Sequence, residues 1–330
     1  MPSPALILGI SLALVFDFLN GMNDAANSIA TVVSTRVLSP RWAVAWAAFF
    51  NFVAVFTFGV AVATTIGKGI VDPAVVTEPM ILAGLIGASL WVYLCTHYGV
   101  PISVSHSLIG GMVGSALAKA GPGSLVVAGV TKVVIFIALA PLIGLFLGFI
   151  HMVAVGWLFR RWAPGRVDRL FRIGQLFSAA LYSLSHGTND AQKTMGIIAV
   201  LLFSGGYLGE EFYVPLWVVF SAYTAIALGT LAGGWRVIRT MGMRITKLRP
   251  VGGFCAETGG GVTLLALAAA GIPVSTTHTI AGAIMGVGAT VRFSAVRWGV
   301  AYEMVVAWIL TIPMAASLAA LISWAMGLIA

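Results

Sequence analysis

The chain has 330 residues, of which 60% are hydrophobic and only 8% are charged. Because a soluble domain carries about 25% charged residues, this composition excludes an ordinary soluble protein and indicates one that lies in a membrane. The net charge of +8 does not indicate nucleic-acid binding, since the basic residues gather in loops between apolar runs. The two main clusters are Arg160, Arg161, Arg166, Arg169 and Arg172, then Arg236, Arg239, Arg244, Lys247 and Arg249.

Apolar runs long enough to cross a bilayer follow one another along the chain. They are continuous rather than alternating, which favours helices over a β-barrel. We therefore expect an all-α integral membrane protein with about ten to twelve membrane segments, some of them broken or re-entrant. Residues 1–19 lack a basic leader, so we interpret them as a retained helix. The later runs are residues 42–66, 80–98, 125–159 (one helix, or two that meet near Pro141), 214–235 and 298–329.

The first motif, Asn-Gly-Met-Asn-Asp-Ala-Ala-Asn in residues 20–27, is matched by His-Gly-Thr-Asn-Asp-Ala-Gln-Lys in residues 186–193. An ionised Asp at membrane depth is costly, and normally pairs with a cation or lines an aqueous cavity. The glycine in each copy would let the helix open and expose backbone carbonyls, and such oxygen ligands suit a hard metal cation such as Na⁺. The candidate cation ligands are Asn23, Asp24, Asn189 and Asp190.

The second motif, Gly-Val-Pro-Ile-Ser-Val-Ser-His-Ser in residues 99–107, is matched by Gly-Ile-Pro-Val-Ser-Thr-Thr-His-Thr in residues 271–279. Proline favours the start of a helix, and helix starts attract anions through free N–H groups and the positive dipole end. The hydroxyls beside them would grip a tetrahedral oxyanion: Ser103, Ser105, Ser275, Thr276 and Thr277. Small residues follow each copy and indicate close helix packing: Gly110, Gly114, Gly282 and Gly286 among them.

The order of the motifs divides the chain into two halves, residues 1–160 and 173–330, joined by a basic linker at 161–172. Equivalent loops of the halves carry opposite charge, as expected for an inverted repeat whose basic loops are cytoplasmic. The N-terminus is then extracytoplasmic. The loop pair after the first motif is Arg36 and Arg41 against Glu210 and Glu211. The same scheme puts Arg292 and Arg297 outside, where basic residues fit less well.

Taken together, these motifs and the segment Gly253-Phe254-Cys255-Ala256-Glu257 resemble the inorganic phosphate transporter (PiT) family over essentially the whole chain. The resemblance implies a secondary transporter with inverted repeats that moves phosphate with Na⁺ or H⁺; some relatives carry sulfate. It implies that Asn23, Asp24, Asn189 and Asp190 bind the cation. It also implies that the anion is surrounded by Ser103, Ser105, Ser275, Thr276, Thr277, Gln192 and Thr194.

Some positions depart from the family pattern or stay open. Many members carry an acidic residue where this chain has Asn51, while the apparent counterpart, Glu257, is acidic and is a further candidate for the coupling cation. Lys193 stands where the first copy has Asn27, and its ammonium would attract the anion, replace a cation or pair with Asp190. The accessory candidates are Asn27, Lys193, His106 and His278, the histidines acting as a proton relay or as structural groups. For His186 we expect a packing or helix-break role.

The sequence thus predicts a cation-coupled symporter of inorganic phosphate that works by alternating access, as a multi-pass protein of the plasma (inner) membrane. The alternatives are a sulfate permease of the same family and a passive anion channel. An intramembrane enzyme is disfavoured, because the chain has no HExxH and no Gly-x-Ser-x-Gly motif. We expect no cofactor beyond Na⁺ or H⁺ as coupling ion, and no nucleic-acid partner. The partners are phosphate or sulfate, the lipid bilayer and, as the small-residue faces permit, a second copy in a homodimer.

Overall fold

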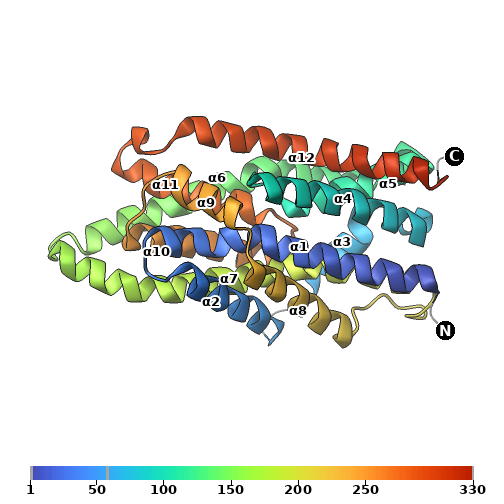
Figure 1. Ribbon diagram of the computed structural model, residues 1–330, viewed down its shortest axis with the longest axis horizontal. Coiled ribbons are helices and arrows are strands. Elements are labelled where there is room, and N and C mark those ends of the chain that lie inside the picture. The colour runs from blue at the N-terminus through green and yellow to red at the C-terminus, as the bar shows by residue number, and fades with distance from the viewer. Residues whose placement is uncertain (1–2, 57–58, 329–330) are drawn as a thin grey trace.

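The computed structural model describes residues 3–56 and 59–328. These residues form twelve α-helices, joined by loops and short 3-10 turns, and no β-strand. The helices lie along one long axis in an elongated bundle (Figure 1). The prediction of an all-α fold is therefore confirmed.

The helices follow the same order in the two halves of the chain. The first half contains α1 (Pro4–Ser34), α2 (Pro40–Val53), α3 (Ala61–Gly69), α4 (Glu78–Tyr98), α5 (Val104–Ala120) and α6 (Val127–Leu158). The second half contains α7 (Pro164–Ser204), α8 (Leu216–Ala232), α9 (Trp235–Arg244), α10 (Pro250–Ala269), α11 (Thr276–Val291) and α12 (Trp298–Ala325). The last helix of each half keeps an internal proline, Pro141 in α6 and Pro313 in α12. The run 125–159 thus contains one continuous helix.

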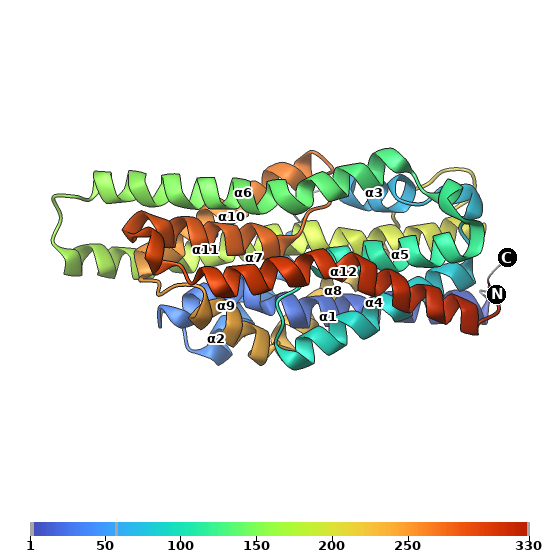
Figure 2. The same ribbon diagram turned by 90° about the horizontal axis from the view of Figure 1, so that it is seen from above.

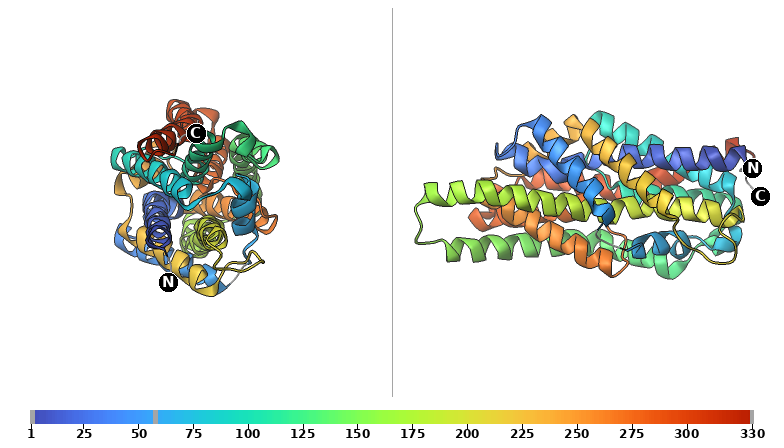
Figure 3. Two further views of the ribbon diagram at one scale, coloured as in Figure 1. Left: turned by 90° about the vertical axis from the view of Figure 1, so that its right-hand side faces the viewer. Right: turned by 90° about the horizontal axis from the view of Figure 1, so that it is seen from below.

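Equivalent helices of the two halves run in opposite directions. α1 begins at the end of the molecule where both termini lie, whereas α7 runs toward that end (Figure 1). α6 and α12 are antiparallel in the same way (Figure 2). Seen end-on, α1 and α7 lie side by side (Figure 3), and they pack against each other. The two motif-bearing helices therefore meet inside the bundle.

The halves also exchange packing partners: α5 packs on α12, and α11 packs on α6. Glycines make these contacts close. A Cβ atom on Gly114 would lie 2.2 Å from the carbonyl oxygen of Ala316, and one on Gly286 would lie 2.0 Å from that of Leu145. Small residues let membrane helices approach backbone to backbone in this way, so the predicted close packing after each second motif is confirmed.

Among the described residues, five helices are long and apolar enough to cross a membrane: α1, α4, α6, α10 and α12. The number rises to seven if two bent pairs, α2 with α3 and α8 with α9, each count as one span. α7 is the longest helix, with 41 residues, but its polar motif lowers its hydropathy. α5 and α11 have only 17 and 16 residues. The described helices thus give five to seven candidate spans, fewer than the ten to twelve membrane segments expected from the sequence.

The two ends of the bundle differ in charge. The loops that join α6 to α7 and α11 to α12 lie at one end, opposite both termini (Figure 2). Hydrogen bonds tie further basic loops to this end, from Arg172 to the Arg36 carbonyl (2.7 Å) and from Thr246 to the Ala295 carbonyl (3.0 Å). The expectation that Arg292 and Arg297 lie apart from the basic linker is therefore wrong. They fall at the same end because α11, like α6, runs toward it.

Candidate functional site

The Asn-Asp motifs lie within continuous helices, so the expected opening of the helix at Gly21 and Gly187 is wrong. α1 and α7 both run unbroken through their motif, and helical carbonyls are bonded within the helix. The glycines instead permit close helix contacts. A Cβ atom on Gly21 would lie 2.1 Å from the Ile226 carbonyl oxygen, and one on Gly187 would lie 2.7 Å from that of Asn51. The candidate cation ligands that these segments offer are therefore side chains rather than freed backbone carbonyls.

Two buried carboxylates and one imidazole meet between α1 and α7. The Nε2 atom of His186 lies 3.6 Å from Oδ2 of Asp24 and 3.5 Å from Oδ2 of Asp190. All three side chains are almost fully buried, and their ligand atoms lie within 4.8 Å of one another. The expectation of a packing or helix-break role for His186 thus missed its contact with both acids. Carboxylate and imidazole ligands of this kind can hold a proton or a metal cation.

Lys193 adds a positive charge to this cluster. Its ammonium forms an ion pair with Asp190, one helical turn earlier on α7. It also donates to Oγ of Ser105 (2.5 Å) and to the carbonyl oxygen of Val274 (2.9 Å). The predicted salt bridge between Lys193 and Asp190 is therefore present, and it links α7 to the starts of α5 and α11.

The starts of α5 and α11 face each other across the acid cluster. Ser105 donates to the Val274 carbonyl (3.3 Å), and Thr277 lies 2.9 Å from the Ile102 carbonyl. Thr277 also lies 3.2 Å from Oδ1 of Asp24. Thr276 donates to Oδ2 of Asp24 (2.9 Å). Hydroxyls of the predicted anion site therefore touch the predicted cation site directly.

Ser103 and Ser275 act as caps of these helices. Oγ of Ser103 accepts from the backbone N–H of His106 (3.1 Å), and Oγ of Ser275 accepts from that of His278 (3.2 Å). A side-chain cap satisfies one of the otherwise free N–H groups of a helix start. The second motif thus forms the helix starts that its prolines predict.

The amides and Thr194 occupy different places around the cluster. Asn27 donates to Oγ1 of Thr277 (3.0 Å), and Asn23 donates to Oγ1 of Thr96 (2.6 Å). Gln192 instead turns toward α3, where its Oε1 accepts from the N–H of Val62 (2.9 Å). Thr194 lies beside Asp17 of α1.

Asn189 is fully buried, and neither amide atom has a hydrogen-bond partner among the described residues. Buried polar groups are normally paired, so this amide stands out beside the acid cluster.

Glu257 forms a separate buried centre on α10. Its carboxylate accepts from Thr31 (2.5 Å), from Gln175 (3.0 Å) and from Ser178. The assumed equivalence with Asn51 is wrong, because Asn51 lies on α2, whereas α10 is equivalent to α4 in the order of helices. Asn51 instead donates to Thr230 of α8 and faces His186.

The two motif histidines pack against each other, with ring centroids 4.9 Å apart. The ring of His278 stacks on Trp308, and its Nδ1 lies 3.3 Å from the Ile137 carbonyl oxygen. Proline has no N–H group, so Pro141, four residues further along α6, leaves that carbonyl without its helical donor. These contacts fit the structural role that we considered for His278.

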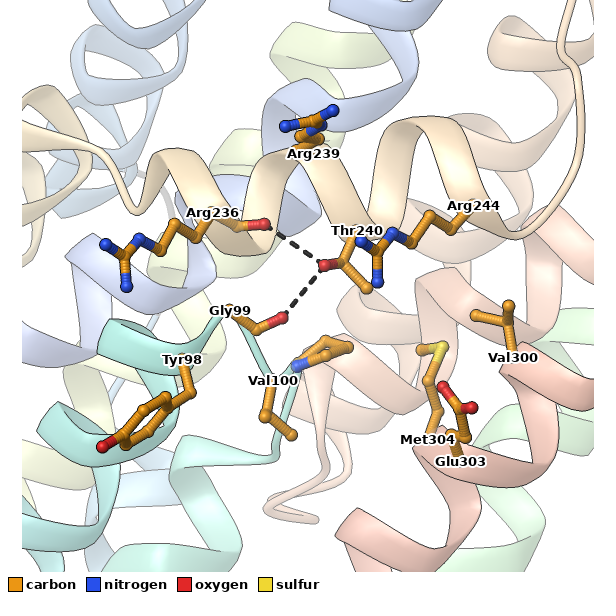
Figure 4. Close-up of a pocket in the computed structure, with 11 residues that line it drawn as sticks. Tyr98, Gly99, Val100, Arg236, Arg239, Thr240, Arg244, Val300, Glu303 and Met304 are labelled. Carbon is orange, nitrogen blue, oxygen red and sulfur yellow. Dashed lines mark hydrogen bonds between the residues drawn. The ribbon is translucent and has the colours of Figure 1, made fainter.

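A basic cavity of about 520 Å³ lies next to the start of α5. Arg236, Arg239 and Arg244 of α9 line it together with the segment from Tyr98 to Pro101 (Figure 4). Thr240 fastens this segment to α9, since its hydroxyl lies 3.0 Å from the Gly99 carbonyl oxygen. The cavity therefore borders the segment that leads to Ser103 and the buried site.

A multi-helix membrane fold with paired carboxylates and hydroxyl-bearing helix starts at its centre defines a membrane transport protein rather than an enzyme. The model of a family described as the phosphate transporter family matches residues 20–319. The chain belongs to this phosphate transporter family.

Relatives match over nearly the full length. A probable low-affinity inorganic phosphate transporter of Rhizobium meliloti (strain 1021) is 59% identical over 327 residues, which is 99% of this chain and 98% of the relative. A protein of the same description from Bacillus subtilis (strain 168) is 43% identical, over 96% of this chain and 95% of the relative. A solved structure described as the sodium-dependent phosphate transporter has a TM-score of 0.91 at 26% identity, covering 99% of this chain and 100% of that one.

Proposed function

We propose that this protein is a symporter of inorganic phosphate that is driven by Na⁺ or H⁺. The descriptions of its relatives as inorganic phosphate transporters support phosphate as the substrate. The sodium dependence named for the similar solved structure supports coupling to a cation.

One observation carries the coupling mechanism: Thr276 and Thr277, at the start of α11, contact the carboxylate of Asp24. An anion that docks on these hydroxyls lies beside a buried negative charge, and repulsion between two buried charges is strong at low dielectric. A cation bound at Asp24 removes this repulsion, so the cation and the anion bind together. The protein with both ions bound, or with neither, is then favoured over the protein with only one ion bound.

The arrangement of the helices supports alternating access by an inverted repeat. Residues 1–160 and 173–330 are the two repeats, and their equivalent helices run in opposite directions (Figures 1 and 2). The linker 161–172 lies at the basic end, which is the cytoplasmic end by the positive-inside rule. We propose that this membrane is the plasma membrane. The arginine-lined cavity then opens toward the cytoplasm and attracts the anion near the buried site.

The test is uptake of radiolabelled phosphate into proteoliposomes with a Na⁺ gradient, a proton gradient or neither, and with unlabelled sulfate as competitor. Uptake driven by one gradient supports the symporter and names its cation. Equilibration that ignores both gradients would instead favour a channel. Strong competition and uptake of sulfate would move the substrate to the sulfate alternative.

A further inference from the structure

Lys193 and Asn27 hold the same position in the two copies of the first motif, and their contacts are equivalent too. The Lys193 ammonium donates to Oγ of Ser105, and Nδ2 of Asn27 donates to Oγ1 of Thr277. Ser105 and Thr277 themselves hold the same position in the two copies of the second motif. Equivalent residues of the two repeats therefore make equivalent contacts on the two sides of the site.

The oxygen atoms around these two positions also correspond. On one side they belong to the Asp190 carboxylate, the Ser105 hydroxyl and the Val274 carbonyl. On the other side they belong to the Thr277 hydroxyl, the Asp24 carboxylate and the Ile102 carbonyl, and the hydroxyl contacts both of the other two. Carboxylate, hydroxyl and carbonyl oxygens are the ligands of hard cations. The sides differ in charge, because residue 193 is an ammonium and residue 27 is a neutral amide.

We infer that the Lys193 ammonium is a tethered cation, which takes at Asp190 the place that a mobile coupling cation takes at Asp24. The inference rests on the proposed symport and specifies its stoichiometry. The protein moves one cation fewer per phosphate than it would with a neutral residue at position 193. His186 does not create this difference, because it lies at nearly the same distance from both carboxylates.

The contacts of the ammonium argue against direct binding of the anion. A lysine ammonium has three N–H donors. Protein oxygens of Asp190, Ser105 and Val274 accept from all three. Lys193 therefore neutralises the negative charge of Asp190. The hydroxyls of the helix starts, rather than the ammonium, hold the anion.

The test variant is Lys193→Asn, which gives the second motif the residue of the first. Phosphate uptake is measured in proteoliposomes against the cation that drives the wild type, which is either external Na⁺ at fixed pH, with choline as the replacement, or external H⁺ at fixed Na⁺. We expect the Hill coefficient for the driving cation to rise by about one over the wild type, because a second cation site becomes available. Lys132→Asn, the same change at an exposed lysine of α6, is the matched control and keeps the wild-type value.

A binding measurement covers the case in which Lys193→Asn does not transport. Thermal unfolding of the purified variant in detergent is compared in sodium chloride and choline chloride, and the inference requires a larger rise in Tm with Na⁺ than in the wild type. Wild-type cation dependence in both measurements would overturn the inference while leaving the symport proposal intact. A higher KM for phosphate without any gain of Na⁺ dependence would also overturn it, by making Lys193 an anion ligand. Absence of phosphate uptake by the wild type itself would instead refute the proposed function.

Discussion

Asp24 and Asp190 are equivalent in sequence but have different neighbours. Asp24 receives hydroxyl contacts from Thr276 and Thr277, whereas Asp190 pairs with the ammonium of Lys193. A hydroxyl that leaves a carboxylate for another partner is itself neutral. An ammonium that loses its carboxylate remains a buried charge without a counter-charge. The same substitution at the two acids therefore has the same effect on coupling and a different effect on stability.

We expect Asp24→Asn and Asp190→Asn each to abolish gradient-driven phosphate uptake. Asp24→Asn removes the charge that the coupling cation neutralises, and Asp190→Asn leaves the Lys193 ammonium uncompensated beside that cation site. Asp190→Asn should also lower the Tm well below that of Asp24→Asn. It leaves Lys193 buried and unpaired, and breaking a buried ion pair costs about 3–5 kcal/mol. Uptake into proteoliposomes and thermal unfolding in detergent measure the two effects.

The control for both variants is Asp72→Asn, because Asp72 is exposed outside the cluster. It should match the wild type in uptake and in Tm. Gradient-driven uptake that survives in both cluster variants would contradict the role of the acid pair.

Ser105→Ala and Thr277→Ala should raise the apparent KM for phosphate more than that for the cation. Each removes one hydroxyl near the proposed anion position, and a hydrogen bond contributes about 1 kcal/mol, or roughly fivefold in affinity. Ser11→Ala, which deletes an exposed hydroxyl on α1, is the control. Equal changes in both apparent constants would argue against anion contacts by these hydroxyls.

At the scale of single residues, the sequence predicted the acids and the hydroxyls because each type occurs twice at a matching position. It did not predict the contact of His186 with both acids, since the other copy has Asn20 there. The partners of Glu257 were also unpredictable. Thr31, Gln175 and Ser178 are separated in sequence and meet only through the packing of α1, α7 and α10.

At the scale of helices, glycine decides which pairs pack closely. A leucine at Gly114 or Gly286 would drive a side chain into the backbone of α12 or α6, and overpacking typically costs about 1–3 kcal/mol, occasionally more. We expect both variants to show a lower Tm and a smaller yield of monodisperse protein in size-exclusion chromatography. Gly156→Leu, at a position in α6 with no atom within 4 Å of an added Cβ, should behave like the wild type; if it lost as much stability, the packing explanation would fail.

Hydropathy located α4, α6 and α12 well, because these helices are apolar along their length. The starts of α5 and α11 followed from the proline motifs, and the structure confirms them. The 41-residue length of α7 was not predictable, since polar residues interrupt its apolar pattern. The role of Gly21 and Gly187 was also misjudged, because sequence alone does not distinguish a glycine that opens a helix from one that admits a neighbour.

At the scale of the whole molecule, the gathering of basic loops at one end sets the orientation in the membrane. We expect Arg161→Cys to react with a membrane-impermeant maleimide only from the cytoplasmic side, and Gly209→Cys, in the loop after α7, only from outside. The native Cys95 and Cys255 are buried and provide a low background. Labelling of intact cells before and after permeabilisation measures the sidedness; the reverse pattern would invert the proposed topology.

The exchange of packing partners between the halves has a consequence for biosynthesis. The glycine-rich face of α5 packs on α12, which leaves the ribosome well after α5. Throughout synthesis of the second half, α5 therefore lacks its native neighbour, although domains generally fold one after another during translation. The native packing of α5 is instead completed only once α12 has been made. A chain that stops before α12 therefore leaves that face uncovered.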